Sequence, residues 1–458
     1  MRMFHPPAGA RAPQAVPWFL LFQAGNAVSF TIGMGAPLVL MTKYLGGSEA
    51  FVGVVLSLTS FMAFLQLFAA RLCDRMGFRR VLTRGWTLRA YFLMLLAPLP
   101  LLRGVLSETV LVGLVVLLTF CFSAVRGFAS GAWFPWLSHL IPSTMRGWFF
   151  GLDQTIFQFA ALLAQVAAGM FLGDSPEGWR YTVVFLAAWL AGLVSVLFLR
   201  GIREDDAARG QAVGGATNGA LPSTLWSELR EVLRHSPIVI TTIYLSLQGV
   251  AVSAATGFLV VYLRDAHWSE DRILFLGALQ TLGILLTSLV WGHMSDRVGS
   301  RPLIRLADLG VMTVFVAWTA SCLGALELTF PLAALLFFAL GMILSAHAVA
   351  SSRIMLASCP PQRVTLGVAF FTLCTSFARG GAPLIWGVVL TLARPSGEAT
   401  MALTWAWLFG GSALTLLIAQ WWLSRLVEPD AMRTHRLVIQ MLWEYPGRVV
   451  STFVAPRR

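Results

Sequence analysis

Two arginines lie inside long apolar runs of the sequence, where a cation is costly and usually faces the protein interior or a water-filled path. Arg126 is followed at helical spacing by Ser130 and Trp133, which would share its face of a helix. Arg379 precedes a Gly-Gly pair and Pro383, which can loosen a helix and free backbone carbonyl groups. A cation beside such groups suits an anionic or hydroxyl-rich ligand. The alternative for both arginines is structural, because backbone carbonyl groups or the membrane edge can also satisfy the charge.

Uncharged polar side chains repeat within other apolar runs at spacings of three, four or seven residues, so that each set occupies one face of a helix. They are Gln23 and Asn26 in one run, Gln154, Gln158 and Gln165 in a second, and Tyr244 and Gln248 in a third. Together with Trp133, Trp136 and Trp386 they would suit a neutral polar solute, because amides hydrogen-bond hydroxyl groups and an indole stacks on a ring. Hydrogen bonds that only join helices are the alternative role for each amide.

Titratable groups are scarce in the apolar runs. Asp153 and Asp308 lie toward one end of their runs, and we expect no acid at mid-depth. His347 has the side chain that titrates near neutral pH, although a single histidine among alanines and serines is also typical of a packed, hydrogen-bonded residue. The predicted substrate-binding set is therefore Gln23, Asn26, Arg126, Trp133, Gln158, Tyr244, Gln248, His347 and Arg379.

The composition excludes a soluble globular chain. Hydrophobic residues make up 57% of the 458 residues, charged residues make up 12%, and the mean hydropathy is +0.75. The net charge of +12 would suggest nucleic-acid binding in a soluble protein, but here the arginines fall in loops between apolar runs, so we expect no nucleic-acid partner. The five cysteines form no CxxC motif, which predicts neither a disulfide nor a metal site.

Twelve apolar runs are long enough to cross a bilayer, which takes about 20 residues in a helix. They cover residues 17–41, 50–70, 81–102, 109–135, 148–172 and 180–200, and then 237–263, 272–292, 303–325, 330–352, 364–392 and 400–424. Residues 1–16 lack the short apolar core and the cleavage site of a signal peptide, so the first run should be retained. The predicted fold is all-α: a polytopic membrane protein of twelve transmembrane helices in two pseudo-symmetric six-helix halves.

A short charged motif occurs twice, each time between the second and third runs of a set of six. The two stretches are ARLCDRMGFRRVL, residues 70–82, and GHMSDRVGSRP, residues 292–302. The glycine that follows each Asp-Arg pair allows a positive φ where one helix reverses into the next. Both stretches resemble the loop signature of the major facilitator superfamily, glycine-x-leucine-x-aspartate-arginine-x-glycine-x-arginine, with Ala70 and Met294 as departures from it. The resemblance implies conformational switch loops made of Asp74, Arg75, Gly77, Arg79, Gly292, Asp296, Arg297, Gly299 and Arg301.

The distribution of Lys and Arg predicts the topology, because basic residues accumulate in cytoplasmic loops. Twenty-four of them fall on the side of the two signature loops and six fall on the other side. Both termini are therefore expected on the cytoplasmic side of a cell (inner) membrane. The predicted parts are a tail (1–16), a six-helix half (17–200), a linker rich in Gly, Ala and charged residues (201–236), a second half (237–424) and a tail with the pattern of an interfacial amphipathic helix (425–458).

The sequence has no P-loop, no HExxH and no other enzyme motif, so we expect neither an enzyme nor a cofactor. The resemblance implies a secondary active transporter that works by alternating access of one site to the two sides of the membrane. We expect a monomer in the lipid bilayer that takes up a small polar solute, for which a sugar or glycoside is one candidate, with a proton or sodium as coupling ion.

Two alternatives stay open. One is efflux of an amphipathic compound, although the fifth run lacks the glycine-proline-glycine motif that drug antiporters of this superfamily carry. The other is a receptor or assembly factor that resembles the superfamily without transporting a solute. A deep polar cavity is expected for a carrier and is unnecessary for an assembly factor.

Overall fold

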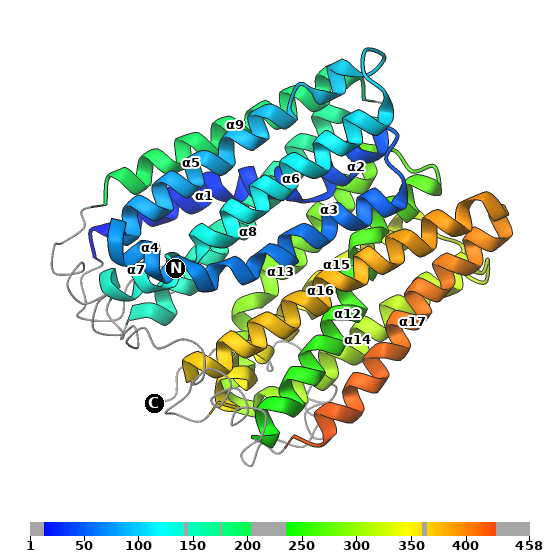
Figure 1. Ribbon diagram of the computed structural model, residues 1–458. Coiled ribbons are helices and arrows are strands. Elements are labelled where there is room, and N and C mark those ends of the chain that lie inside the picture. Colours follow the sequence, from blue (N-terminus) through cyan, green and yellow to red (C-terminus); the bar gives the residue numbers. More distant parts are fainter. Residues whose placement is uncertain (1–12, 142–144, 175, 203–234, 360–363, 427–458) are drawn as a thin grey trace, which may run out of the picture. The chain divides into compact units, whose positions relative to one another are not determined.

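The computed structural model describes residues 13–141, 145–174, 176–202, 235–359 and 364–426. Within these ranges the regular structure is helical, apart from an isolated β-bridge between Arg103 and Leu106. Twelve candidate spans are long and apolar enough to cross a membrane, which confirms the predicted polytopic all-α fold (Figure 1). Nearly all of the predicted linker and of the amphipathic C-terminal tail lies outside the described residues.

The helices form where the sequence is continuously apolar, because a backbone in lipid must satisfy its polar groups internally. The first six spans hold α1 (Ala15–Met34) and α2 (Ala36–Tyr44), α3 (Glu49–Phe61) with η2 (Met62–Phe68), α5 (Phe78–Leu96) with η3 (Leu99–Leu102), α6 (Glu108–Ser130), α8 (Arg146–Leu172) and α9 (Gly178–Arg200). Two short helices, α4 (Ala69–Met76) and α7 (Trp133–Leu140), follow the second and fourth spans. The last six spans hold α12 (Ser236–Asp265), α13 (Glu270–Val298), α14 (Ser300–Cys322), α15 (Phe330–Ala357), α16 (Val364–Ala393) with η7 (Arg394–Ser396), and α17 (Glu398–Ser424).

The predicted fourth run is not one continuous helix. α6 ends at Ser130, and the next helix, α7, begins at Trp133. Gly127 and Gly131 lie against η2, where added Cβ atoms would be 2.0 and 2.5 Å from backbone oxygens of that segment. Two glycines four residues apart therefore let the backbone of η2 approach α6 closely. Trp133 does not belong to the helix of Arg126, so the prediction that they share one helical face is wrong.

Both signature loops turn at the predicted glycines. Gly77 has a φ of +81° and directly precedes α5, and Gly299 has a φ of +89° and directly precedes α14. A side chain at either position would be strained in this region of φ, which is why glycine stands there. The predicted positive φ is confirmed in both halves.

The last arginine of each signature contacts the end of a helix in its own half. Arg79 Nη2 donates to the carbonyl oxygen of Arg200, the last residue of α9, at 2.5 Å. Arg301 Nη2 donates to the carbonyl oxygen of Ser424, the last residue of α17, at 2.6 Å. A cation bound at a helix C-terminus is favourable, because the last carbonyl groups have no partner within the helix. The side chains of Asp74, Asp296 and Arg297 lie outside the described part of the structure.

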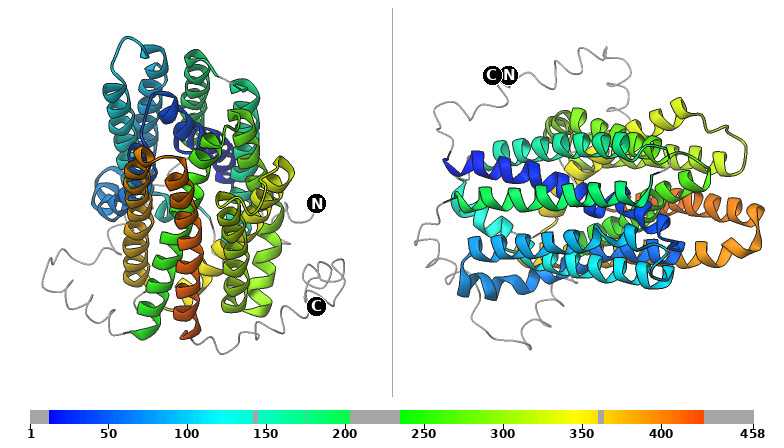
Figure 2. Two further views of the ribbon diagram at one scale, coloured as in Figure 1. Left: turned by 90° about the vertical axis from the view of Figure 1, so that its right-hand side faces the viewer. Right: turned by 90° about the horizontal axis from the view of Figure 1, so that it is seen from above.

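The chain divides into two compact units. Unit 1 comprises residues 1–221, 257–278 and 383–391, and unit 2 comprises residues 222–256, 279–382 and 392–458. Within unit 1, α1 packs against α8 and α9, and α5 packs against α6 and α9. Within unit 2, α14 packs against α15 and α17. Figure 2 shows the same helices from two further sides.

Unit 1 includes ends of three helices from the second half of the sequence. Gly53 in α3 lies against the backbone of Pro383 and Gly387 in α16, where a Cβ would be 2.4 Å from the Pro383 carbonyl oxygen. The hydroxyl of Tyr181 in α9 donates a hydrogen bond to Glu270 at the start of α13. These contacts lie at the ends of the helices opposite to the signature loops.

Candidate functional site

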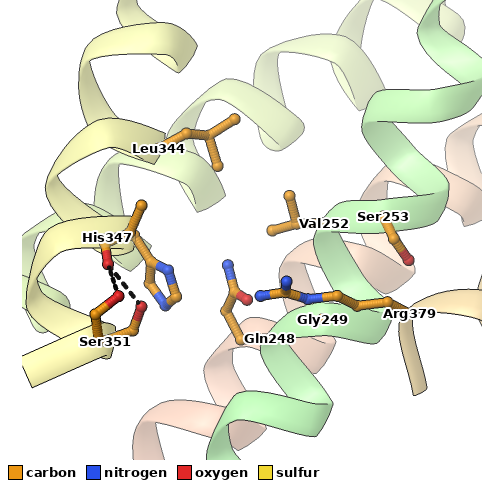
Figure 3. Close-up of a pocket in the computed structure, with 10 residues that line it drawn as sticks. Gln248, Gly249, Val252, Ser253, Leu344, His347, Ser351 and Arg379 are labelled. Carbon is orange, nitrogen blue, oxygen red and sulfur yellow. Dashed lines mark hydrogen bonds between the residues drawn. The ribbon is translucent and has the colours of Figure 1, made fainter. Parts of the chain in front are cut away.

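A cavity of about 360 Å³ opens between three helices of unit 2. Its lining comes from α12 (Gln248, Gly249, Val252 and Ser253), α15 (Leu344, His347, Ala348, Ser351 and Ser352) and α16 (Arg379). Three members of the predicted substrate-binding set, Gln248, His347 and Arg379, therefore lie around one cavity (Figure 3). Its size falls in the range that holds small organic ligands.

Arg379 is the charged group of this cavity. Its side chain passes over Gly249, where an added Cβ would lie 2.7 Å from the Arg379 Cγ. The guanidinium group is directed toward the amide of Gln248 (Figure 3). Among the described residues it has no hydrogen bond and no ion pair. A guanidinium group in this position offers several unused N–H donors to a ligand.

Two buried polar atoms on the cavity wall also have no protein partner. They are the Oε1 of Gln248, whose side chain is almost fully buried, and the Oγ of Ser253. A buried polar atom without a hydrogen bond destabilises a protein by about 1–3 kcal/mol, so such atoms usually meet a ligand or water. The cavity thus combines a cation with unsatisfied neutral groups.

A hydrogen-bonded cluster lies directly behind the cavity. The Tyr244 hydroxyl donates to Asp308 Oδ2 at 2.8 Å and lies 2.9 Å from His347 Nε2. The Nε2 of Gln420 donates to the same carboxylate oxygen at 2.5 Å, and the other carboxylate oxygen lies 3.8 Å from His347 Nε2. With the Tyr244 proton on Asp308, the histidine must donate from Nε2 to the phenol oxygen. The imidazole therefore connects a buried carboxylate to the cavity.

Asp308 lies deeper than the sequence indicates. α14 begins at Ser300, three residues earlier than the predicted run, which places Asp308 about 12 Å along the helix at 1.5 Å per residue. Its side chain has no exposed surface. His347 is equally buried and is not a single polar group among small residues, because it contacts both Tyr244 and Asp308. The expectation that no acid lies at depth is corrected by these contacts.

A second polar chain lies inside unit 1. Gln23 Nε2 donates to Asp153 Oδ2 at 3.0 Å, and Asn26 Nδ2 donates to Gln23 Oε1 at 3.1 Å. The Asn26 Oδ1 accepts from Trp86 Nε1 at 3.1 Å and from the guanidinium group of Arg89. Two members of the predicted set, Gln23 and Asn26, thus link a carboxylate to a cation.

Arg89 is a buried cation that the predicted set omitted. Only 1% of its surface is exposed, and its guanidinium carbon lies 4.8 Å from the ring centre of Trp86 and 5.2 Å from that of Phe122. These cation–π contacts and the bond to Asn26 stabilise the charge. Arg89 lies inside a span with aromatic neighbours on the same helix, which was the available signal in the sequence.

The other predicted residues of unit 1 have separate surroundings. The Arg126 guanidinium carbon lies 4.4 Å from the ring centre of Phe30, and this group has no hydrogen bond or ion pair among the described residues. The Trp133 ring packs against Phe19 and Phe22, with ring centres 5.5 and 5.4 Å apart, as part of the aromatic core. Gln158 is half-buried in α8.

The two halves place polar residues at equivalent positions. The signature aspartates are 222 residues apart, and the same offset relates Asn26 to Gln248 and Trp86 to Asp308. An offset of 221 relates Arg126 to His347 and Gln158 to Arg379. The buried polar groups of the two units therefore descend from the same places in a repeated helical plan.

Twelve spans, two repeated halves and a polar cavity inside one half define a multi-pass membrane protein with a transporter fold. The family model of the Major Facilitator Superfamily matches residues 18–269 and again residues 246–440. The chain belongs to the major facilitator superfamily. This confirms the resemblance of the two signature loops.

Solved structures of transporters share the fold. The nucleoside transporter NupG is 13% identical with a TM-score of 0.65, over 89% of this chain and 99% of that one. The inward open xylose transporter XylE from E. coli is 17% identical with a TM-score of 0.63, over 93% and 98% of the two chains. A bacterial homolog of the human lysosomal transporter Spinster is 14% identical with a TM-score of 0.66, over 93% and 100%. No curated protein sequence matches the chain significantly.

Proposed function

We propose that this protein is a secondary transporter that binds a small polar solute in the cavity of unit 2 and moves it by alternating access. The observation that carries the proposal is the set of unused polar groups on the cavity wall: the Arg379 guanidinium, the Gln248 Oε1 and the Ser253 Oγ. A cavity that is only a packing defect is lined by apolar groups and stays dry. A non-transporting member of the superfamily has no need of such a cavity.

The coupling ion in this proposal is a proton. Carboxyl and imidazole groups buried in membrane spans commonly form proton relays. Asp308, Tyr244 and His347 form a continuous hydrogen-bonded path from a buried carboxylate to the cavity wall. Binding of the solute beside His347 would then depend on where the proton resides. The fold relatives include a D-xylose–proton symporter, for which coupling to protons is part of the name.

Localisation and organisation follow from the charge distribution. We propose that the protein lies in a cell (inner) membrane with both termini in the cytoplasm, because basic residues favour the side of the signature loops by 24 to 6. The proposed protein acts as a monomer of two six-helix halves, residues 17–200 and 237–424, joined by a cytoplasmic linker. A sugar or glycoside remains a candidate solute, since Gln248 and the serines can bind hydroxyl groups.

A thermal-shift screen of the purified protein in detergent tests the proposal. Sugars, organic anions and lipophilic cations are added separately, because a ligand bound only to the folded state stabilises it by RT ln(1 + [L]/Kd). We expect a polar solute to raise the melting temperature of the wild type and to act less on Gln248→Ala. The matched control is Gln154→Ala, an exposed amide outside the cavity. Stabilisation by lipophilic cations alone would support efflux instead, and equal responses of both variants would contradict the cavity assignment.

A further inference from the structure

We propose that the solute is a small organic anion that also carries at least one hydroxyl group, with its acid group on Arg379 and a hydroxyl on Gln248. This inference rests on the proposed transport function and narrows its substrate class. It differs from a neutral sugar in one testable respect, which is the requirement for a negative charge.

The charge argument begins with the cations of the membrane spans. Three charged side chains lie at least eight residues from both ends of a candidate span: Arg89, Arg379 and Asp308. Arg89 is sealed in unit 1 against Asn26 and two aromatic rings. Asp308 accepts hydrogen bonds from Tyr244 and Gln420, at the far side of His347 from the cavity. Arg379 is the cation of these three that faces a cavity and has no bonded partner among the described residues.

An unpaired cation at this depth indicates a partner that is absent from the protein itself. A charged group in the middle of a span is costly unless it is paired, and intramembrane charges usually mark substrate or ion paths. Carboxylate and phosphate groups match the planar fork of a guanidinium group, and such charge-assisted hydrogen bonds are about twice as strong as neutral ones. An acid group of the solute would therefore supply the missing counter-ion of Arg379.

The hydroxyl requirement comes from the neutral groups of the same wall. The Gln248 amide can present its oxygen or, after rotation, its NH₂ group to the cavity, and the Ser253 Oγ can both donate and accept. A hydroxyl group is also both donor and acceptor, so it satisfies either arrangement. In Figure 3 the amide of Gln248 lies beside the guanidinium group, so one small molecule can reach both. A sugar acid, a hydroxy acid and a sugar phosphate share this combination of groups.

Gly249 fixes the position of the cation. Its missing side chain leaves room for the Arg379 stem, because a Cβ there would lie 2.7 Å from Cγ and 3.2 Å from Nε. Gly249→Ala therefore moves the guanidinium group while it keeps the charge. Arg379→Lys keeps the charge and removes the fork, and Arg379→Gln removes the charge.

The experiment compares solutes that differ only in the acid group. Glucuronate, glucose 6-phosphate and glucose are titrated into the purified full-length protein, and the dissociation constants are measured by tryptophan fluorescence and by thermal shift. We expect glucuronate or glucose 6-phosphate to bind and glucose to bind at least about tenfold more weakly. The carboxylate and phosphate arms decide which acid group the cavity takes.

The variants locate the binding. Arg379→Gln should weaken binding of the anion by about 10- to 100-fold, and Arg379→Lys and Gly249→Ala should each weaken it by about three- to tenfold. Arg272→Gln, which removes an exposed arginine at the start of α13, is the matched control and should bind like the wild type. The melting temperature without solute shows whether each variant is folded, and Arg379→Lys provides a second test if Arg379→Gln does not fold.

The outcomes separate this inference from the proposed function. Equal binding of glucose and glucuronate, with both lost in Gln248→Ala, would overturn the anion requirement and leave the cavity as the transport site. Anion binding that Arg379→Gln and Arg272→Gln reduce equally would overturn the assignment to Arg379. If none of the three solutes binds, the inference fails, and the proposed function fails with it only if no solute of the wider screen depends on Gln248.

Discussion

The buried polar side chains form a different kind of chain in each unit. In unit 1 two amides, Gln23 and Asn26, link Asp153 to a sealed arginine. In unit 2 a phenol and an imidazole, Tyr244 and His347, link a buried aspartate to a cavity. An amide keeps its protons under ordinary conditions, whereas an imidazole accepts and releases one near neutral pH. The first chain is therefore suited to holding helices together, and the second is suited to moving a proton.

The difference is instructive because it arises at equivalent positions of a repeated fold. Asn26 and Gln248 are 222 residues apart, yet the oxygen of Asn26 accepts two hydrogen bonds and the oxygen of Gln248 accepts none from the protein. The same place in the helical plan is saturated in one half and unsatisfied in the other. Packing saturates a polar group, and a binding site leaves one open. We use this contrast to order the predictions.

The largest expected effect separates the two aspartates. Asp308→Asn should abolish uphill accumulation driven by a pH gradient, because the amide keeps the shape of the side chain and removes its protonation. Asp153→Asn should reduce uphill uptake by about threefold or less, since an intramembrane hydrogen bond contributes about 0.6 kcal/mol. Uptake into proteoliposomes of a solute found by thermal shift, with and without an imposed pH gradient, measures both.

The control for this pair is exchange of labelled solute without a gradient, which needs no net proton movement. Asp308→Asn should retain this exchange, and its loss would mean that the variant is misfolded or cannot bind. Equal loss of uphill uptake in the two variants would contradict the assignment of the relay to unit 2.

The next effect separates the two amides. Asn26→Ala leaves the Trp86 N–H and the buried Arg89 charge without their acceptor, which should lower the free energy of unfolding by about 2–4 kcal/mol. Gln248→Ala removes an oxygen that has no protein partner, so the free energy of unfolding should change by less than about 1 kcal/mol. Solute binding should instead weaken by about three- to tenfold in Gln248→Ala. Equilibrium unfolding in mixed micelles and a binding titration give the two quantities.

Asn26→Asp refines this comparison. The carboxylate keeps an acceptor at the right place and adds an opposite charge to Arg89, so the loss of stability should be smaller than in Asn26→Ala. If Asn26→Ala and Gln248→Ala destabilise the protein equally, the description of unit 1 as the saturated half is incorrect.

Much of the fold follows from the sequence because its determinants are local. Continuous apolar runs predict helices, since lipid leaves the backbone no other way to satisfy its polar groups. Gly77 and Gly299 predict their turns, because a positive φ is a property of one residue. The break after α6 was missed because it depends on η2, a distant segment that lies against Gly127 and Gly131.

The site was predicted less completely for a physical reason. Helical spacing identifies which polar residues share a face, and it correctly pairs Gln23 with Asn26. It does not show which helix lies opposite, so the partners of His347 in α12 and α14 could not be predicted. Comparing the two halves position by position would have drawn attention to Asp308, which stands where the first half has Trp86.

The smallest expected effect concerns a region in which the two units are alike. Arg79→Gln and Arg301→Gln each remove a hydrogen bond to the last carbonyl group of a helix, α9 in one unit and α17 in the other. Each variant should lose about 0.5–1 kcal/mol of stability, because a cation at a helix C-terminus contributes this much. Arg75→Gln, an exposed arginine of the same signature, should change little. Thermal unfolding of the three variants side by side measures these differences. Similar losses for Arg79→Gln and Arg301→Gln would show that the repeated turn has kept one structural role while the polar chains diverged, and a loss confined to one unit would show that the turns have diverged as well.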